Sequence, residues 1–254
     1  MSIEPYHDKQ MTLLDHLEEL RQRVFKSLLA IFFGAFISLI LVKPLVKILE
    51  APASSIHFLQ LAPGEFLFVS IKVAGYAGLT IAIPYIVFQI LSFVLPGLTK
   101  DEKRLIAPAV AGSAVLFLGG IFFAWKMLLP AALNFLIGYG AEVVEPLWSI
   151  EKYLDFVLLL MIGTGLSFQI PILQLFLGLL GVIKWQEMLS AWRWVVIASA
   201  IAGAVITPST DPITMMLLAS SISVLFLLGV LLVAIADKFK EQIPPASNPP
   251  SNAG

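Results

Sequence analysis

The feature that most constrains this chain is a series of long apolar segments that carry almost no charge. Five of them have about 19 or more residues, enough for a helix to cross the ~30 Å hydrocarbon core of a bilayer. The chain is 59% hydrophobic and 13% charged, whereas soluble domains are nearer half apolar and a quarter charged. We predict an all-α polytopic membrane protein with six transmembrane helices, at about residues 24–42, 65–95, 105–129, 153–180, 194–206 and 213–236.

The remaining residues predict one membrane domain with short ends. The domain covers 12–236, after a loose tail at 1–11 and before a cytoplasmic tail at 237–254, whose Pro-, Ser- and Asn-rich sequence is typical of disorder. Residues 12–23 predict an amphipathic helix that lies along the membrane surface and runs into the first span. Its apolar residues share one stripe, and Glu19 and Arg23 form an i,i+4 pair in the favourable order.

The fifth apolar segment is unusual because it is short. Residues 194–206 would form a helix of roughly 20 Å, which cannot reach the far surface of the bilayer. The following turn, Thr207 to Pro212, contains two prolines and would lie below that surface. Such a turn is tolerated in a membrane only where it packs in protein or faces water. We expect a locally thinned bilayer beside it.

The basic residues set the orientation. Of the 16 lysines and arginines, eleven fall on one side of the predicted spans, four on the other, and Lys72 lies within a span. The side that is rich in Lys and Arg is cytoplasmic by the positive-inside rule, or stromal in a plastid. Both termini are therefore expected inside. The outer lysines are Lys43, Lys47, Lys126 and Lys152.

The connection between the second and third spans, residues 93–108, is the most charged stretch of the chain. It contains five consecutive charged residues, 100–104. Pro96 and Gly97 end one helix, and Thr99 with Glu102 has the spacing of a capping box that starts the next. One interpretation is a turn whose polar groups satisfy helix ends. The other is a rigid elbow that displays a carboxylate to a cationic ligand.

Three polar side chains fall within predicted spans, where each costs free energy. The long stem of Lys72 can extend toward the outer surface, and Asp155 can act as an acid at a helix start. Gln169 lies about four turns deep and must find a partner. That partner is either the backbone freed by Pro171 or another chain in the membrane.

Composition excludes several classes of function. The net charge of −1 argues against a nucleic-acid partner. The chain has no cysteine, which removes thiol catalysis and thiolate metal sites. His16 and His57 do not have the spacing of metal ligands, and no nucleophile or phosphate-binding motif is present. We expect no enzymatic activity, no metal and no cofactor.

Four motifs together resemble one family. They are DHLEELRQR (15–23), FQILSFVLPGLTKDEKRLIAP (88–108), FQIP (168–171) and TPSTDP (207–212). Their order and the six-helix layout resemble TatC, the core receptor subunit of the twin-arginine protein translocase. The resemblance covers nearly the whole chain. Gln169, where many relatives have glutamate, resembles the cyanobacterial and plastid branch.

The resemblance implies a concave wall of helices with short fifth and sixth helices, in a bacterial plasma membrane or a cyanobacterial thylakoid. It implies a receptor for signal peptides with consecutive arginines, acting in a homo-oligomer with single-span TatA- and TatB-like partners. That complex exports folded proteins using the proton-motive force. On this sequence, Glu102 would receive a signal-peptide arginine and Glu19 would complete the acidic site. Other matched positions are His16, Leu20, Arg21, Phe93, Pro96 and Lys100 near that site, Gln169 and Pro171 at a partner helix, and Pro52 and Asp211 on the outer side.

A small-solute secondary transporter is the alternative. Lys72, Asp155, Gln169 and the break at 207–212 favour it, because transporters use interrupted helices and buried polar groups. Against it, the sequence shows no inverted repeat and no second, matching interruption. The charged residues are also expected toward one surface rather than at the membrane midplane.

Overall fold

The computed structural model describes residues 13–54, 56–94, 106–140, 147–207 and 211–241. Five helical stretches are long and apolar enough to cross a membrane, and Trp192–Ile206 is a shorter apolar helix. The predicted six-helix membrane fold is therefore confirmed. The predicted tail at 1–11, residues 242–254 and most of the 93–108 connection lie outside the described residues. Residues 237–241 are helical, so the predicted C-terminal tail begins too early in the chain.

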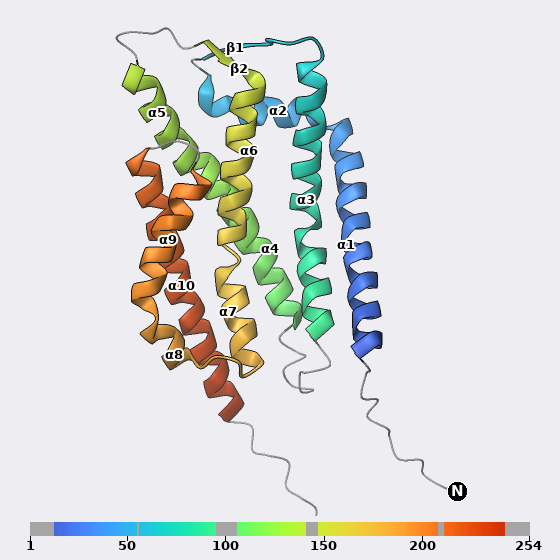
Figure 1. The fold of residues 1–254 in the computed structure, drawn as a ribbon, viewed down its shortest axis with the longest axis vertical. Coiled ribbons are helices and arrows are strands. Elements are labelled where there is room, and N and C mark those ends of the chain that lie inside the picture. The colour runs from blue at the N-terminus through green and yellow to red at the C-terminus, as the bar shows by residue number, and fades with distance from the viewer. Residues whose placement is uncertain (1–12, 55, 95–105, 141–146, 208–210, 242–254) are drawn as a thin grey trace, which may run out of the picture.

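The first span is one continuous helix. Helix α1 covers Leu13–Ile40 and runs straight past residue 24 (Figure 1), so the structure differs from the expected separate surface helix. No glycine or proline interrupts α1 before Gly34, and the Glu19–Arg23 pair bridges the expected boundary. Helix α2 (Val42–Glu50) then turns crosswise and ends in a short 3₁₀ turn, Ala51–Ala53.

The second and third spans are longer than a crossing requires. Helix α3 covers Glu65–Val94 and contains Pro84. Helix α4 (Ile106–Phe123) continues through a π-helical segment, Ala124–Leu128, into α5 (Leu129–Gly140). The π-helical bond from Leu129 N to Ala124 O precedes Pro130, which has no N–H to donate. The third helix therefore extends past its predicted end at residue 129.

The fourth span is interrupted, and the fifth is short. Helix α6 (Ile150–Ser167) ends before Phe168 and Gln169, and α7 (Ile170–Leu179) follows. Pro171 explains the break, because its ring clashes with the carbonyl four residues earlier. Helix α8 (Trp185–Ser190) then leads into α9 (Trp192–Ile206), whose 15 residues confirm the short fifth helix.

The sixth helix is not short, and this part of the expectation is wrong. Helix α10 covers Pro212–Glu241, 30 residues. It extends beyond the apolar run into the charged residues that follow, because the sequence has no proline or glycine between Gly229 and Pro244. Among the described spanning segments, α9 is therefore the short one.

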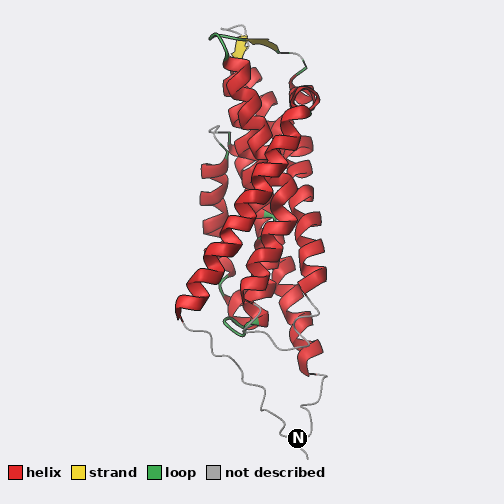
Figure 2. Cartoon of the chain, turned by 90° about the vertical axis from the view of Figure 1, so that its right-hand side faces the viewer, coloured by secondary structure: helices red, strands yellow, loops and turns green. Residues whose placement is uncertain are grey.

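The two outer loops are joined by a small sheet that an all-α prediction did not include. Strand β1 (His57–Leu59) pairs in parallel with β2 (Leu147–Ser149), with His57 opposite Leu147. Figure 2 shows both strands at one end of the bundle. The buried side chain of Glu65 reinforces this link, because it accepts hydrogen bonds from Ser149 Oγ at 2.7 Å and from Ala62 N at 3.0 Å.

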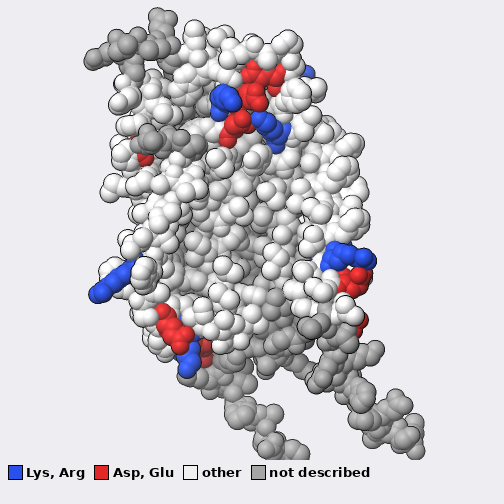
Figure 3. All heavy atoms as spheres, in the orientation of Figure 1, with Lys and Arg blue, Asp and Glu red and all other residues white. Residues whose placement is uncertain are grey.

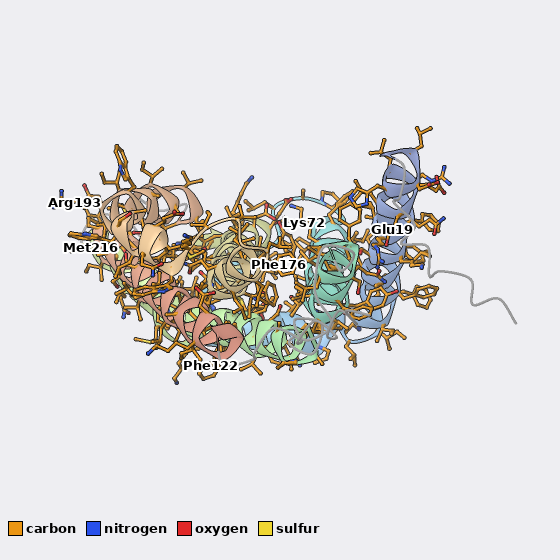
Figure 4. The ribbon with its side chains drawn as sticks, turned by 90° about the horizontal axis from the view of Figure 1, so that it is seen from below. Glu19, Lys72, Phe122, Phe176, Arg193 and Met216 are labelled. Carbon is orange, nitrogen blue, oxygen red and sulfur yellow. The ribbon has the colours of Figure 1, made fainter. Side chains whose placement is uncertain are left out.

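The helices form a curved wall rather than a closed bundle. Seen from below, α1, α3, α7 and α9 follow a shallow arc, with α4 and α10 behind it (Figure 4). The main core lies between α2, α3, α5 and α6 and includes Val69, Leu128, Leu129, Leu154 and Val157, each almost fully buried. The predicted concave arrangement is confirmed. Helix α1 stands at one edge and packs chiefly on α3.

Candidate functional site

A polar cluster lies between the inner ends of α1 and α3. Glu19 Oε1 accepts a hydrogen bond from Arg23 Nε at 2.9 Å and a second one from Arg23 Nη2. Arg23 Nη1 also donates to Gln89 Oε1 at 3.2 Å, across to α3. The side chains of Glu19 and Arg23 are only 20% and 23% exposed. Figure 4 shows Glu19 on α1, at the edge of the wall.

The second carboxylate oxygen of Glu19 is an unsatisfied hydrogen-bond acceptor within the described structure. Glu19 Oε2 is buried and has no hydrogen-bond partner among the described residues. A buried carboxylate oxygen without a donor costs free energy, and a donor that reaches it recovers that cost. The hydroxyl of Ser92, three residues after Gln89 on α3, is also buried without a partner in the described structure.

An aromatic contact adjoins this cluster. The rings of His16 and Phe93 are stacked, with centroids 4.2 Å apart and planes 17° apart. His16 precedes Glu19 by three residues, and Phe93 follows Gln89 by four, so the four residues lie on the facing sides of α1 and α3. The structure thus brings three predicted site residues, His16, Glu19 and Phe93, into one place.

Two other residues of the same motif face away. Arg21 Nη2 pairs with Glu18 Oε1 at 2.6 Å, and the Arg21 side chain is 77% exposed. Leu20 is also exposed. The predicted motif therefore divides into residues that face α3 and residues on the outer surface of α1, and Arg21 is not part of the Glu19 cluster.

Three predicted residues, Pro96, Lys100 and Glu102, lie outside the described residues. The segment that carries them joins the end of α3 to the start of α4. Those two helices pack against each other. The place of the Glu102 carboxylate stays a prediction.

Gln169 has a partner that the sequence did not suggest. Gln169 Oε1 accepts from Ser113 Oγ at 2.6 Å, and Gln169 Nε2 donates to the Ser113 carbonyl at 3.1 Å. The reciprocal pair joins the α6–α7 break to α4. The local alternative, in which Gln169 bonds the backbone freed by Pro171, is therefore not what the structure shows. Pro171 is buried and packs beside Gly229 of α10.

The two predicted outer residues have structural environments. Asp211 is fully buried and caps α10, because its carboxylate accepts from Ile213 N and Thr214 N at 3.0 Å each, and from Thr214 Oγ1. An acid at this position also faces the positive end of the helix dipole. Pro52 lies in the 3₁₀ turn after α2.

Lys72 and Asp155 form one ionic cluster instead of acting separately. Lys72 Nζ contacts Glu151 Oε1 at 2.8 Å and Asp155 Oδ1 at 2.9 Å. Figure 3 shows basic and acidic side chains gathered near the outer end of the molecule, at the top of the view. A largely uncharged band separates them from the charged side chains near the inner end. The ion pair with Glu151, at the outer end of α6, agrees with a Lys72 side chain that extends toward the outer surface. The cluster lies far from Gln169 along the helices, which removes the argument for a transporter site.

Sequence reasoning missed Gln89 and Ser113. A signal for Gln89 was present, since it is an amide within a predicted membrane span, the same reasoning that singled out Gln169. Ser113 has no such signal, because a serine in a membrane helix can bond its own backbone.

Comparison with known proteins identifies this arrangement. The family model for "Sec-independent protein translocase protein (TatC)" matches residues 15–220. The chain belongs to the TatC family. It is 53% identical over 231 residues to TatC of Synechocystis sp., covering 91% of each chain. It is 50% identical over 233 residues to chloroplastic TATC of Arabidopsis thaliana, covering 91% of this chain and 68% of that protein.

The fold supports the same conclusion. A crystal structure of the "Twin Arginine Translocase Receptor- TatC" superposes with a TM-score of 0.76 at 33% identity, over 87% of this chain and 99% of that one. The family and the spans make this chain a multi-pass membrane component of Sec-independent protein translocation, in a plasma or thylakoid membrane.

Proposed function

We propose that this TatC protein is a receptor whose inner edge binds the paired arginines of signal peptides carried by folded cargo. The observation that carries the proposal is the free oxygen of Glu19, buried beside the His16–Phe93 stack. A guanidinium offers a planar fork of donors that suits a carboxylate. Because Arg23 is also held by Gln89, it can stay in place while a ligand donates to Glu19 Oε2.

A second carboxylate makes the site specific for two arginines. Glu102, on the connection between α3 and α4, would engage one arginine while Glu19 engages the other. At partly exposed positions each pair contributes on the order of 1 kcal/mol. The apolar segment of the signal peptide would contribute the rest of the affinity by burying surface against the helix wall. Such a role needs binding and conformational change, with no catalytic group.

The proposal is tested with two peptides that differ only in their basic pair. We expect the detergent-purified chain to bind an Arg-Arg signal peptide several-fold more tightly than its Lys-Lys counterpart, because the ammonium group cannot form the bidentate contact. Fluorescence anisotropy of labelled peptides gives both dissociation constants. Equal affinities would contradict a site built for guanidinium groups.

We also propose that Gln169 contacts single-span TatA- or TatB-like partners in a larger complex that contains further copies of this chain and uses the proton-motive force. Its amide lies half-buried at the helix break, and its pair with Ser113 leaves one N–H and one lone pair free to reach another helix. We expect Gln169→Leu to keep peptide affinity unchanged but to lower photo-crosslinking to a co-expressed single-span partner.

The control for this prediction is Ser113→Ala, which removes the Ser113 hydroxyl from the pair without touching the amide. If only the internal pair matters, Ser113→Ala also lowers crosslinking, though less than Gln169→Leu, because it removes one of the two hydrogen bonds. If Gln169 contacts the partner, Ser113→Ala leaves crosslinking unchanged and Gln169→Leu lowers it. Crosslinking that is undiminished in Gln169→Leu would leave the internal pair as the only role of this residue.

A further inference from the structure

Arg23 occupies one half of the Glu19 carboxylate. Its Nε donates to Glu19 Oε1 at 2.9 Å, and its Nη2 donates to the same oxygen. A carboxylate oxygen has two lone pairs, so Oε1 is fully used. Oε2 is the oxygen left without a partner in the described structure. A ligand that binds Glu19 while this pair is intact must therefore bind at Oε2.

Gln89 holds Arg23 in this position. Arg23 Nη1 donates to Gln89 Oε1 at 3.2 Å, and Gln89 is buried on α3. One guanidinium thus bonds a residue of its own helix and a residue of the neighbouring helix. If Arg23 turned away from Glu19, it would lose hydrogen bonds to both.

The spacing between these two helices is fixed by their backbones. Gly34 of α1 and Gly78 of α3 meet directly, since a Cβ built on Gly34 would lie 2.8 Å from Gly78 O. Small residues allow such an approach in membrane helices. Because α1 cannot come closer to α3, the reach of Arg23 toward Gln89 is set by the packing of the two helices.

Arg23 also cancels the charge of Glu19. Both side chains are largely buried, whereas the Glu18–Arg21 pair on the outer face of α1 is exposed. Water and salt therefore screen the Glu19–Arg23 pair less. A cation that approaches Glu19 meets a neutral pair with one acceptor oxygen, and not an open negative charge. What remains for a ligand is a directed hydrogen bond to Oε2.

Such an acceptor favours a guanidinium over an ammonium group. Arg23 shows the geometry, because two of its nitrogens donate to a single carboxylate oxygen. A ligand arginine can do the same at Oε2. A lysine ammonium is compact and strongly hydrated, and it must lose water to reach a buried oxygen. With the charge of Glu19 already cancelled, little attraction offsets that loss.

We infer that Arg23 is a specificity-determining residue of the proposed peptide site. By holding Oε1 and cancelling the charge of Glu19, it makes the site discriminate against lysine, and it lowers the affinity for arginine to a smaller extent. The inference rests on the proposed receptor function, because it concerns how that site selects its ligand.

Arg23→Gln in the detergent-purified full chain tests the inference. Fluorescence anisotropy gives the dissociation constants of the Arg-Arg peptide and of its Lys-Lys counterpart for the parent and the variant. We expect the variant to bind the Lys-Lys peptide about tenfold more tightly than the parent and the Arg-Arg peptide about threefold more tightly, because an uncancelled carboxylate attracts both cations. The preference for arginine should therefore fall about threefold.

Two controls separate this role from overall charge. Lys26→Gln removes a positive charge from an exposed position of α1, three residues after Arg23, and should change either dissociation constant less than twofold. In a Glu19→Gln background, Arg23→Gln should leave the preference unchanged, because the carboxylate on which Arg23 acts is absent. Thermal unfolding shows that each variant is folded. If Arg23→Gln does not fold, Gln89→Leu loosens the same guanidinium and should lower the preference about twofold.

The inference is overturned if folded Arg23→Gln keeps the preference of the parent or weakens both peptides alike. It is also overturned if Lys26→Gln has the same effect, or if Arg23→Gln still lowers the preference in the Glu19→Gln background. For the second variant, an unchanged preference in Gln89→Leu is the contradicting result. Equal affinities of the parent for the two peptides would instead overturn the proposed receptor site, and the inference with it, so the two failures are distinguishable.

Discussion

Replacing Glu19 by glutamine is expected to weaken binding of an Arg-Arg signal peptide by about 5- to 30-fold, a loss of ~1–2 kcal/mol. Glutamine keeps the shape of the side chain, so the helix and its packing are retained. It loses the charge that a guanidinium requires and replaces the free Oε2 with an amide or a weaker acceptor. Peptide titration by fluorescence anisotropy measures the change. Glu19→Gln/Glu102→Gln should lower the affinity further, to that of a Lys-Lys peptide.

Glu18→Gln is the matched control, since it makes the same chemical change one residue earlier. Glu18 faces outward and pairs with the exposed Arg21, so its loss should change peptide affinity less than twofold. Thermal unfolding of each variant separates lost binding from lost folding. If Glu18→Gln and Glu19→Gln weaken binding equally, only overall charge matters, and the site between α1 and α3 is wrong.

The features that could be predicted from the sequence are those that depend on the local pattern of residues. Long apolar runs gave the spans, and the thirteen-residue run gave the short fifth helix, because a helix needs a fixed number of residues to cross hydrocarbon. The spacing of Glu19 and Arg23 gave their ion pair, since residues four apart meet on a helix. Each of these features depends on residues that are near one another in the chain.

Features that depend on contacts between distant segments could not be predicted. Lys72 meets Asp155 across 83 positions, and Gln169 meets Ser113 across 56. The sequence shows that each buried polar group needs a partner but not which one. The β1–β2 pair could not be predicted either, because strands of three residues carry too little sequence pattern to detect. The unbroken α1 shows that a change in polarity alone does not end a helix.

The close contact of α1 with α3 leads to the prediction with the largest effect on stability. A Cβ on Gly78 would lie 2.3 Å from Ala35 N and 2.8 Å from Ile31 O, both backbone atoms of α1. No side-chain rotation relieves such a clash, so α1 must move away from α3. Small residues allow this approach in membrane helices. We expect Gly78→Ala to destabilise the protein by about 2–3 kcal/mol, which lowers Tm by roughly 4–12 °C.

Gly75→Ala is the matched control on the same helix. A Cβ on Gly75 meets nothing within 4 Å, so this variant should only gain the higher helix propensity of alanine, up to ~1 kcal/mol. Thermal unfolding in one detergent compares the two variants. If Gly78→Ala is as stable as Gly75→Ala, the two helices do not approach as closely as the structure has them.

The displacement of α1 caused by Gly78→Ala should also change the geometry of the candidate peptide site around Glu19. Helix α1 stands at the edge of the wall and packs chiefly on α3, so a shift at Gly78 changes how His16 and Glu19 face Phe93 and Gln89. Because the chain has no cysteine, His16→Cys/Phe93→Cys can be crosslinked by a short bismaleimide without background. We expect Gly78→Ala to lower this crosslinking and Arg-Arg peptide affinity together, while Gly75→Ala lowers neither. Peptide affinity that persists when the crosslink is lost would show that Glu19 binds without its contact to α3.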